Sequence, residues 1–192
     1  MFTICCGERY KKLSELTIPN FIDYSKKINS HFECITKTNQ NWPKSVSLKL
    51  RTKDYLKEYK RVFFIDLDCY IHPDAPNIFE EHPNESFYIK KMPRDGFFQI
   101  NSGVFIANQS HKEIFEPCPI EEPQIEQAEQ SVFEKTLCQQ LNNSMLKIES
   151  LKPDWHVCPY DQNKSFHIYH AHDENKRALL LKKIIETKIK FQ

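Results

Sequence analysis

Residues 61–68 read RVFFIDLD, an apolar run that ends in two aspartates separated by one residue. Val62 to Ile65 are apolar at every position, which is typical of a strand buried on both faces of a sheet. Such a strand belongs in the middle of an α/β domain, with neighbours on both sides. Asp66 and Asp68 then lie at its carboxyl end, the edge where α/β sheets bind their ligands.

Strand and helix patterns alternate along the chain outward from this stretch. Strands are predicted at 2–6, 31–36, 86–91, 101–107, 145–151 and 166–170, and helices at 10–28, 48–59, 126–141 and 177–191. Pro19 is expected to interrupt the first helix. The alternation predicts an α/β fold with a mixed, mostly parallel central sheet flanked by helices. A length of 192 residues suits one domain, so we expect residues 1–192 to form a single domain.

The composition argues against several functional classes. A formal net charge of +1 disfavours bulk electrostatic capture of nucleic acid or of an anionic membrane. No window is apolar over the length that spans a bilayer, and the first apolar run is too short for a secretory leader, so we expect a cytoplasmic protein. The seven cysteines include no C-x-x-C pair, which argues against a zinc ribbon and favours reduced, mostly buried thiols.

The two aspartates predict a metal site. Carboxylates at the end of a buried strand suit Mg²⁺ or Mn²⁺, which take oxygen ligands and bridge phosphates. His170 ends another apolar strand, and an imidazole as third ligand favours Mn²⁺. Lys176 follows nearby, where a cation would neutralise a leaving diphosphate. The alternatives are a capping or turn role for Asp66 and Asp68, a core position for His170 and a surface position for Lys176.

Glycine is scarce in this chain, which makes each position informative. It occurs only as Gly7, Gly96 and Gly103, all at the ends of predicted strands or in loops beside them. Glycine is required where the backbone takes a positive φ or approaches a ligand closely. We therefore expect these residues to lie at strand ends and site loops, with an ordinary turn as the alternative for Gly96.

Four segments resemble, in order and spacing, the glycogenin and lipopolysaccharide galactosyltransferase group of GT-A enzymes (glycosyltransferase family 8 and its neighbours). They are FTICCGERY at 2–10, KLRTKDYLKEYKRVFFIDLDCYIHPDAPNIFE at 49–80, INSGVFIANQS at 100–110 and HAHDENK at 170–176. The matches span most of the chain, and INSGVF and VFFIDLD are the most specific pieces. Asp173 stands where the group has glycine, and Glu129 stands where it usually has aspartate.

The resemblance implies a GT-A fold, which is Rossmann-like, and a metal-dependent glycosyltransferase that moves a sugar from a UDP-sugar to a glycan, protein or lipid-linked acceptor, with retention of configuration. Mn²⁺ or Mg²⁺ is the implied cofactor. The implied metal ligands are Asp66, Asp68 and His170. The implied contacts to the nucleotide and donor are Thr3, Ile4, Cys5, Tyr10, Lys49, Asp66, Leu67, Ser102 and Lys176. The implied catalytic residues are Glu129, Gln130 and Asn101.

Several points of this interpretation stay open. Retention is compatible with same-face attack or with a glycosyl-enzyme intermediate on Glu129, which requires a reachable carboxylate. His172 competes with His170 as a ligand. Trp155 and His156, in PDWHVCPY, resemble a loop that lines the acceptor side, although Trp155 suits the core equally well. Because little sequence remains beyond a donor-binding core, we expect an acceptor site that is open or completed by another domain or chain.

Two rival functions use similar features. A sugar-phosphate nucleotidyltransferase also combines an α/β sheet with acidic metal ligands, but it normally has a glycine-rich phosphate loop near the amino terminus, where this chain has only Gly7. A non-catalytic nucleotide-sugar-binding module would bind UDP and Mn²⁺ without turning over a donor. A zinc-stabilised interaction domain is disfavoured by the cysteine spacing.

Overall fold

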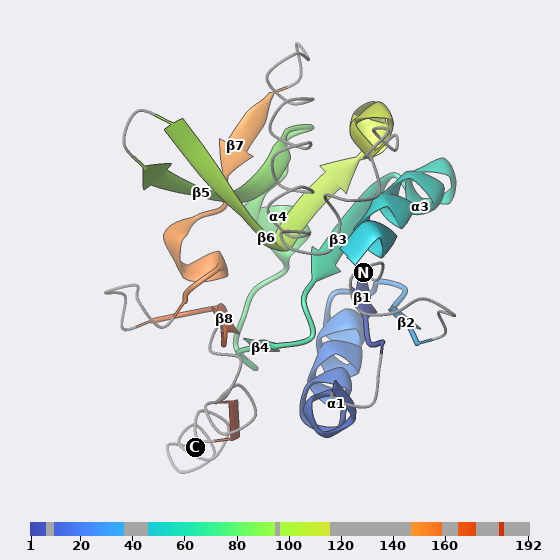
Figure 1. The fold of residues 1–192 in the computed structure, drawn as a ribbon, viewed down its shortest axis with the longest axis vertical. Coiled ribbons are helices and arrows are strands. Elements are labelled where there is room, and N and C mark those ends of the chain that lie inside the picture. Colours follow the sequence, from blue (N-terminus) through green and yellow to red (C-terminus); the bar gives the residue numbers. More distant parts are fainter. Residues whose placement is uncertain are drawn as a thin grey trace, which may run out of the picture.

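The computed structural model describes residues 1–6, 10–36, 46–94, 97–115, 147–158, 165–171 and 181–182. A six-stranded sheet with the order β2-β1-β3-β6-β5-β7 forms its centre (Figure 1). The strands are β1 (Phe2–Ile4), β2 (Glu33–Ile35), β3 (Arg61–Ile65), β5 (Phe87–Arg94), β6 (Phe97–Asn108) and β7 (Ile148–Ser150). Among these strands only β6 runs antiparallel to its neighbours. The predicted mixed, mostly parallel sheet is confirmed.

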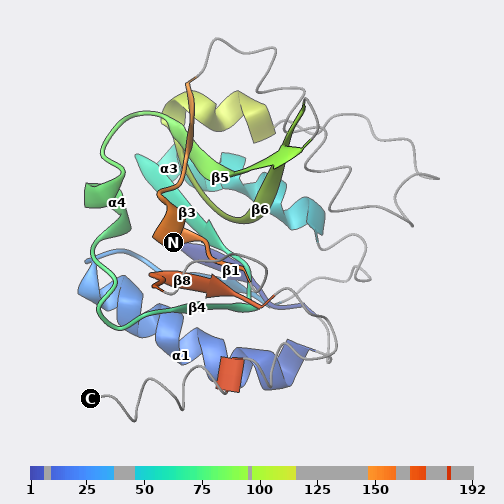
Figure 2. The ribbon, with the colours of Figure 1, turned by 90° about the vertical axis from the view of Figure 1, so that its left-hand side faces the viewer.

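Helices cover both faces of this sheet, as Figure 1 and Figure 2 show from two directions. The helical elements are α1 (Lys11–Lys27), α3 (Thr52–Glu58), α4 (Ile78–Glu81) and the 3₁₀ turns η2 (Val46–Arg51), η3 (Gln109–Phe115) and η5 (Pro153–Trp155). None of the described helices is long and apolar enough to cross a membrane. The helices predicted at 126–141 and 177–191 lie outside the described residues, apart from the helical pair 181–182.

β3 lies between β1 and β6, in the central position that its sequence predicts. Val62 to Ile65 are each at most 3% exposed. Their side chains alternate between two apolar clusters: Phe63 and Ile65 join the cluster under α1, and Val62 and Phe64 join the cluster under α3 and η3. Because both faces are packed, the backbone that leads into the two aspartates is firmly held.

The expected interruption at Pro19 is wrong, because α1 runs unbroken through this residue. Proline removes the N–H that would bond to the carbonyl of Glu15. Both residues are exposed, so that carbonyl is open to water. The other side of the helix is anchored, since the Asn20 amide donates to the carbonyl of Ile71 and accepts its N–H, both at 2.8 Å. Tertiary contacts thus outweigh the cost of the proline.

The strand predicted at 166–170 does not join the main sheet. β8 (Ile168–His170) pairs antiparallel with β4 (Cys69–Ile71), and Cys69 lies opposite His170. The prediction that His170 ends a strand of the parallel sheet is therefore wrong. His170 still arrives at the end of β3, because β4 follows the aspartates directly. The backbone N–H of Ala171 donates to the carbonyl of Asp68 at 2.8 Å.

The pairing of β5 with β6 shifts at one point, inside the INSGVF segment. Ile89 lies opposite Phe105, but the next residue, Lys90, lies opposite Asn101. Residues 102–104 of β6 therefore fall outside the register with β5. An irregularity of this kind bends a strand and re-aims its side chains. Here it lets the middle of β6 approach the turn that follows β3.

Candidate functional site

Asp68 and His170 lie against each other at the end of β3. The Nε2 atom of His170 is 3.1 Å from Oδ1 of Asp68, and both side chains are buried. A turn positions the aspartate, since the N–H of Cys69 donates to the carbonyl of Asp66 at 3.1 Å and the chain continues into β4. Two residues far apart in the sequence thus form one buried ion pair, as the predicted metal set requires.

Asp66 contacts Lys49 instead. The Nζ atom of Lys49 lies 3.1 Å from Oδ1 and 3.2 Å from Oδ2 of Asp66, and it donates to the carbonyl and hydroxyl oxygens of Ser102 at 3.2 and 3.3 Å. Lys49 is 5% exposed, and an ammonium group at that depth requires such partners. Three residues expected to contact the donor therefore form one cluster, in which Asp66 keeps 24% of its side chain exposed.

The charges of these groups are linked. Burial alone would lower the pKa of His170, but the charge and hydrogen bond of Asp68, together with Cys158 and Asp66, raise that pKa to about 10. Near neutral pH, His170 therefore carries a proton and donates its Nε2–H to Asp68. Burial raises the pKa of Asp66, Lys49 lowers it, and the charge of Asp68 raises it further. The two negative charges oppose each other, and a divalent cation would relieve that repulsion.

Gly103 allows the His170 ring to reach Asp68. A Cβ atom at residue 103 would lie 2.3 Å from Cε1 and 2.7 Å from Nδ1 of His170, far inside van der Waals contact. The carbonyl of Gly103 also accepts the backbone N–H of Asp66 at 2.7 Å. Glycine was predicted where the backbone takes a positive φ or approaches a ligand closely, and the close neighbour of Gly103 is instead the His170 ring. The approaching group is a side chain of the protein itself.

The residues expected to hold the nucleotide surround the end of β1. Phe2 pairs in parallel with Phe64, which sets Ile4 level with Asp66 on the neighbouring strand. Ile4 and Cys5 are half-buried. Thr3 is fully buried, and its hydroxyl has no hydrogen-bond partner among the described residues. The end of β1 and the aspartates therefore line one edge of the sheet.

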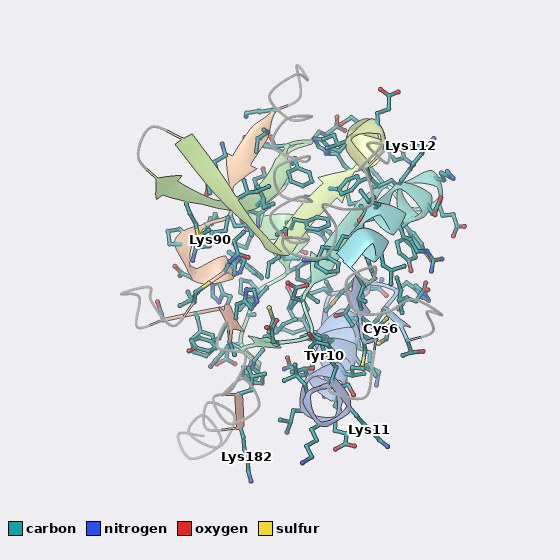
Figure 3. The ribbon with its side chains drawn as sticks, viewed as in Figure 1. Cys6, Tyr10, Lys11, Lys90, Lys112 and Lys182 are labelled. Atoms are coloured by element: carbon teal, nitrogen blue, oxygen red, sulfur yellow. The ribbon has the colours of Figure 1, made fainter. Side chains whose placement is uncertain are left out.

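Other expected site residues are buried in different ways. Tyr10 lies directly before α1, and Figure 3 shows it beside that helix, separated from Lys90 of β5. The Oδ1 atom of Asn101 accepts the N–H of Gly103 at 3.0 Å, which turns this side chain onto the INSGVF backbone. Leu67 packs into the apolar cluster under α1, so its backbone is the part that remains for a ligand.

His156 and Cys158 complete the surroundings of His170, a placement that the sequence analysis missed. The segment around Val157 runs along the edge of β8 that β4 leaves open, and Val157 pairs there with Tyr169. Alternate side chains of such a segment share a side. The Nε2 atom of His156 lies 2.8 Å from Nδ1 of His170. The sequence contains one signal for this placement, the pattern H-x-C, in which His156 and Cys158 are metal-ligand residue types at alternate positions.

Trp155 and the remaining predicted residues are placed as follows. Trp155 is fully buried, with its ring 4.8 Å from the ring of His167, so of its two possible positions it takes the core. Glu129, Gln130 and Lys176 lie outside the described residues. Their expected roles stay predictions.

The donor set suits a hard divalent cation. Asp66 and Asp68 offer carboxylate oxygens and His170 an imidazole nitrogen, a combination that fits Mn²⁺. A cation would displace the proton that His170 shares with Asp68. The ligand atoms of Asp68, Cys69 and His170 lie within 4.8 Å of one another. Burial raises the pKa of the Cys69 thiol well above its ordinary value. Sulfur is also a ligand that Mn²⁺ does not favour, so Cys69 is not placed in the Mn²⁺ set.

The sequence matches no protein-family model and no curated protein. Solved structures do match. The galactosyltransferase LgtC, in complex with donor and acceptor sugar analogues, aligns with a TM-score of 0.62 at 9% identity, over 97% of this chain and 94% of that chain. A glycosyltransferase involved in glycosylation of the major capsid of PBCV-1 aligns with a TM-score of 0.61 at 13% identity, over 95% of this chain and 98% of that chain. Mouse xyloside xylosyltransferase 1 aligns with a TM-score of 0.56 at 10% identity, over 89% of this chain and 96% of that chain.

At such low identity the likeness is one of fold. The described chain has the GT-A fold of these glycosyltransferases, and the predicted fold class is confirmed.

Proposed function

We propose that this chain is a metal-dependent glycosyltransferase that moves a sugar from a UDP-sugar to a glycan, protein or lipid-linked acceptor. The observation that carries the proposal is the buried pair of Asp68 and His170, with Asp66 held by Lys49 at the other end of the same turn, at the end of the central strand of a GT-A fold. An acid pair and an imidazole at that edge suit a cation that grips a diphosphate. Glycosyltransferases of the same fold support the class of reaction.

The proposed ligands of the cation are Asp66, Asp68 and His170, and Mn²⁺ is the proposed ion. When bound, it supplies Lewis-acid stabilisation of the charge that develops on the leaving UDP. Lys49 holds Asp66 at 3.1 Å, while the backbone of Ala171 holds the turn at Asp68. Both carboxylates are therefore oriented before a substrate arrives, so little reorganisation is needed during the reaction.

The remaining donor contacts follow from position. Residues at the end of β1, with the first residue before α1, are proposed to hold the nucleotide, and the start of INSGVF is proposed to orient the sugar. The proposed nucleotide contacts are Thr3, Ile4, Cys5 and Tyr10. The proposed sugar and diphosphate contacts are Lys49, Leu67, Asn101, Ser102, Gln130 and Lys176.

We propose that transfer retains the anomeric configuration, with Glu129 beneath the anomeric carbon. On a same-face path, Glu129 stabilises the positive charge of the sugar while the acceptor attacks. On a two-step path, its carboxylate displaces UDP to form a glycosyl ester, and the acceptor hydroxyl then displaces the carboxylate. Mass spectrometry of protein quenched with donor distinguishes the paths, since only the second leaves a sugar on Glu129.

The test is donor hydrolysis with Mn²⁺ and a panel of UDP- and GDP-sugars, followed by nucleotide release. We expect turnover of one UDP-sugar that requires the cation and falls at least about 100-fold in Asp68→Asn, because a ligand carboxylate is lost. Asp74→Asn is the matched control, since its carboxylate is 84% exposed and away from the site. Cation-independent release, or equal rates in both variants, would contradict the proposal.

The same material separates the rival functions. UDP binding that requires Mn²⁺, seen by calorimetry without release from any donor, would favour a non-catalytic binding module. Pyrophosphate release from UTP and a sugar 1-phosphate would favour a nucleotidyltransferase.

A further inference from the structure

His170 is the shared member of two groups of metal-ligand side chains. Its Nε2 atom faces the carboxylate of Asp68, and its Nδ1 atom faces Nε2 of His156 at 2.8 Å. The ligand atoms of His156, Cys158 and His170 all lie within 4.8 Å of one another, and all three residues are buried. One side of a single imidazole therefore meets oxygen, and the other side meets nitrogen and sulfur.

We propose that His156, Cys158 and His170 form a binding site for a thiophilic divalent cation of the zinc class. Two imidazoles and one thiolate are ligands that Zn²⁺ prefers, and three protein ligands leave a fourth position for water. Mn²⁺ takes oxygen ligands by preference and gains little from sulfur. An oxygen-based site at Asp66 and Asp68 therefore does not account for a cysteine and a second histidine on the far side of His170.

The spacing of the ligand atoms is close to what a zinc ion requires. Tetrahedral bonds of about 2.0–2.1 Å set two ligand nitrogens about 3.3 Å apart. The nitrogens of His156 and His170 are 2.8 Å apart, so the rings need to separate by only about 0.5 Å. The backbone around them is held, because the N–H of His170 donates to the carbonyl of Val157 at 2.8 Å and the N–H of Val157 donates to that of Ile168 at 2.9 Å.

Polar groups surround the sulfur of Cys158. The Nζ atom of Lys90 lies 3.6 Å from the sulfur and also donates to the carbonyl of His156 at 3.0 Å. The amide nitrogen of Asn101 lies 4.0 Å from the same sulfur. Lys90, which Figure 3 labels, thus fixes the segment that carries His156 and Cys158 to β5 and helps to hold both ligand side chains in place.

Sharing of His170 has a consequence for the Mn²⁺ set. A cation bound through Nδ1 leaves the proton on Nε2, where it faces Asp68, so Nε2 offers no lone pair to Mn²⁺ and zinc-class ions compete with Mn²⁺ for His170. This competition rests on the proposed function; the zinc-class site itself does not.

Cobalt(II) alone is the probe for the site, because bound thiolate gives it a near-ultraviolet charge-transfer band. We expect the wild-type protein to show this band, Cys158→Ser to lose it, and His156→Gln to bind Co²⁺ at least about tenfold more weakly. Cys69→Ser and a Cys5→Ser/Cys34→Ser variant are the matched controls and should keep the band. A wild-type protein without the band, a Cys158→Ser variant that keeps it, or loss in Cys69→Ser alone overturns the proposal.

A second measurement uses only the wild-type protein, in case the variants fold poorly. X-ray absorption of the Zn²⁺ complex should contain one sulfur at about 2.3 Å with nitrogen at about 2.0–2.1 Å. A shell of oxygen and nitrogen without sulfur would overturn the site. Competition is read separately from the free Mn²⁺ signal in electron paramagnetic resonance: one equivalent of Zn²⁺ should release Mn²⁺. If Mn²⁺ never binds, the proposed function fails while the cobalt result still decides the thiolate site.

Discussion

The six-stranded sheet and the β4–β8 pair share the apolar cluster under α1, but polar side chains of α1 also hold the second. The large sheet is packed on both faces by apolar side chains, with Phe63 and Phe64 of β3 completely buried. The β4–β8 pair has strands of three residues each, and polar side chains of α1 fix the backbone of β4 and of the loop that follows. Those side chains are Asn20, Tyr24 and Lys27, which bond to the backbone of residues 71, 73, 75, 76 and 78.

This contrast indicates which contacts of the β4–β8 pair are most sensitive to substitution. Apolar packing is spread over many residues in both regions, since Tyr70, Ile71 and Ile168 belong to the same cluster as Phe63. The hydrogen bonds from α1 to the β4 region are few and directional. Loss of one of them should therefore disturb the β4–β8 pair more than the large sheet.

The largest effect is expected at Gly103, where the two sheets meet. Gly103→Ala places a methyl group 2.3 Å from the His170 ring, which is buried and bonded at both nitrogens. We expect a loss of about 3 kcal/mol in the free energy of unfolding. Urea denaturation followed by circular dichroism measures it. Because the cause is one ring, the cost should fall below about 1 kcal/mol in a His170→Ala background. Equal costs in the two backgrounds would show that the ring is not the obstacle.

A smaller effect is expected from the contact between α1 and β4. Asn20→Ala leaves the buried N–H and carbonyl of Ile71 without their 2.8 Å partners, so we expect a loss of about 2 kcal/mol. Hydrogen exchange at the Ile71 amide should accelerate, while amides of β3 stay protected. Ser14→Ala is the matched control, since its hydroxyl donates to the carbonyl of Lys11 in the same helix and its other partner, Cys5, lies outside the β4 region. Comparable losses in both variants would contradict the assigned role of Asn20.

The smallest expected effect is a pH dependence of the free energy of unfolding that arises from His111, beside the large sheet. Burial lowers the pKa of His111 from its ordinary value of 6.5 to about 4, and its Nδ1 accepts the N–H of Asn108. Below pH 6.5 the unfolded chain binds a proton that the folded chain refuses, so stability is complete above 6.5 and falls as pH drops toward 4. Between pH 6 and pH 5 the loss should be about 1 kcal/mol. Denaturant titrations at both pH values measure it.

The comparison for this prediction is His111→Asn, which keeps an acceptor for the Asn108 N–H but cannot titrate in this range. Its lower stability should change less between the two pH values than that of the wild type. An identical pH response in the two proteins would exclude His111 as the source.

The central sheet could be predicted from the sequence because its signal is local. An unbroken apolar run identifies β3 as a central strand. The aspartates that follow it must then lie at the edge of the sheet where β3 has its carboxyl end. Pro19 misled the helix prediction, since propensity does not include the anchoring of Asn20 on Ile71. His170 was predicted at the correct edge, beside the aspartates, but its strand pairs with β4 and does not belong to the six-stranded sheet. Pairing of β8 with β4 depends on two short strands far apart in the chain, for which no local pattern exists.

The surroundings of His170 were the least predictable part of the site. His156 and Cys158 reach it through the bridge between Val157 and Tyr169, a contact between neighbouring segments that composition does not encode. The scarcity of glycine pointed to Gly103, but not to the ring that approaches it. The roles of residues in 116–146 stay predictions, because that segment lies outside the described part of the chain.

The three-residue pairing of β8 with β4 constrains how this chain can diverge. Side chains alternate along a strand, so sliding β8 by a single position would put Tyr169 in front of Asp68 and turn the imidazole to the opposite face. Relatives should accordingly gain or lose residues freely in the loops on either side, yet keep the number of residues from Ile168 to His170 fixed.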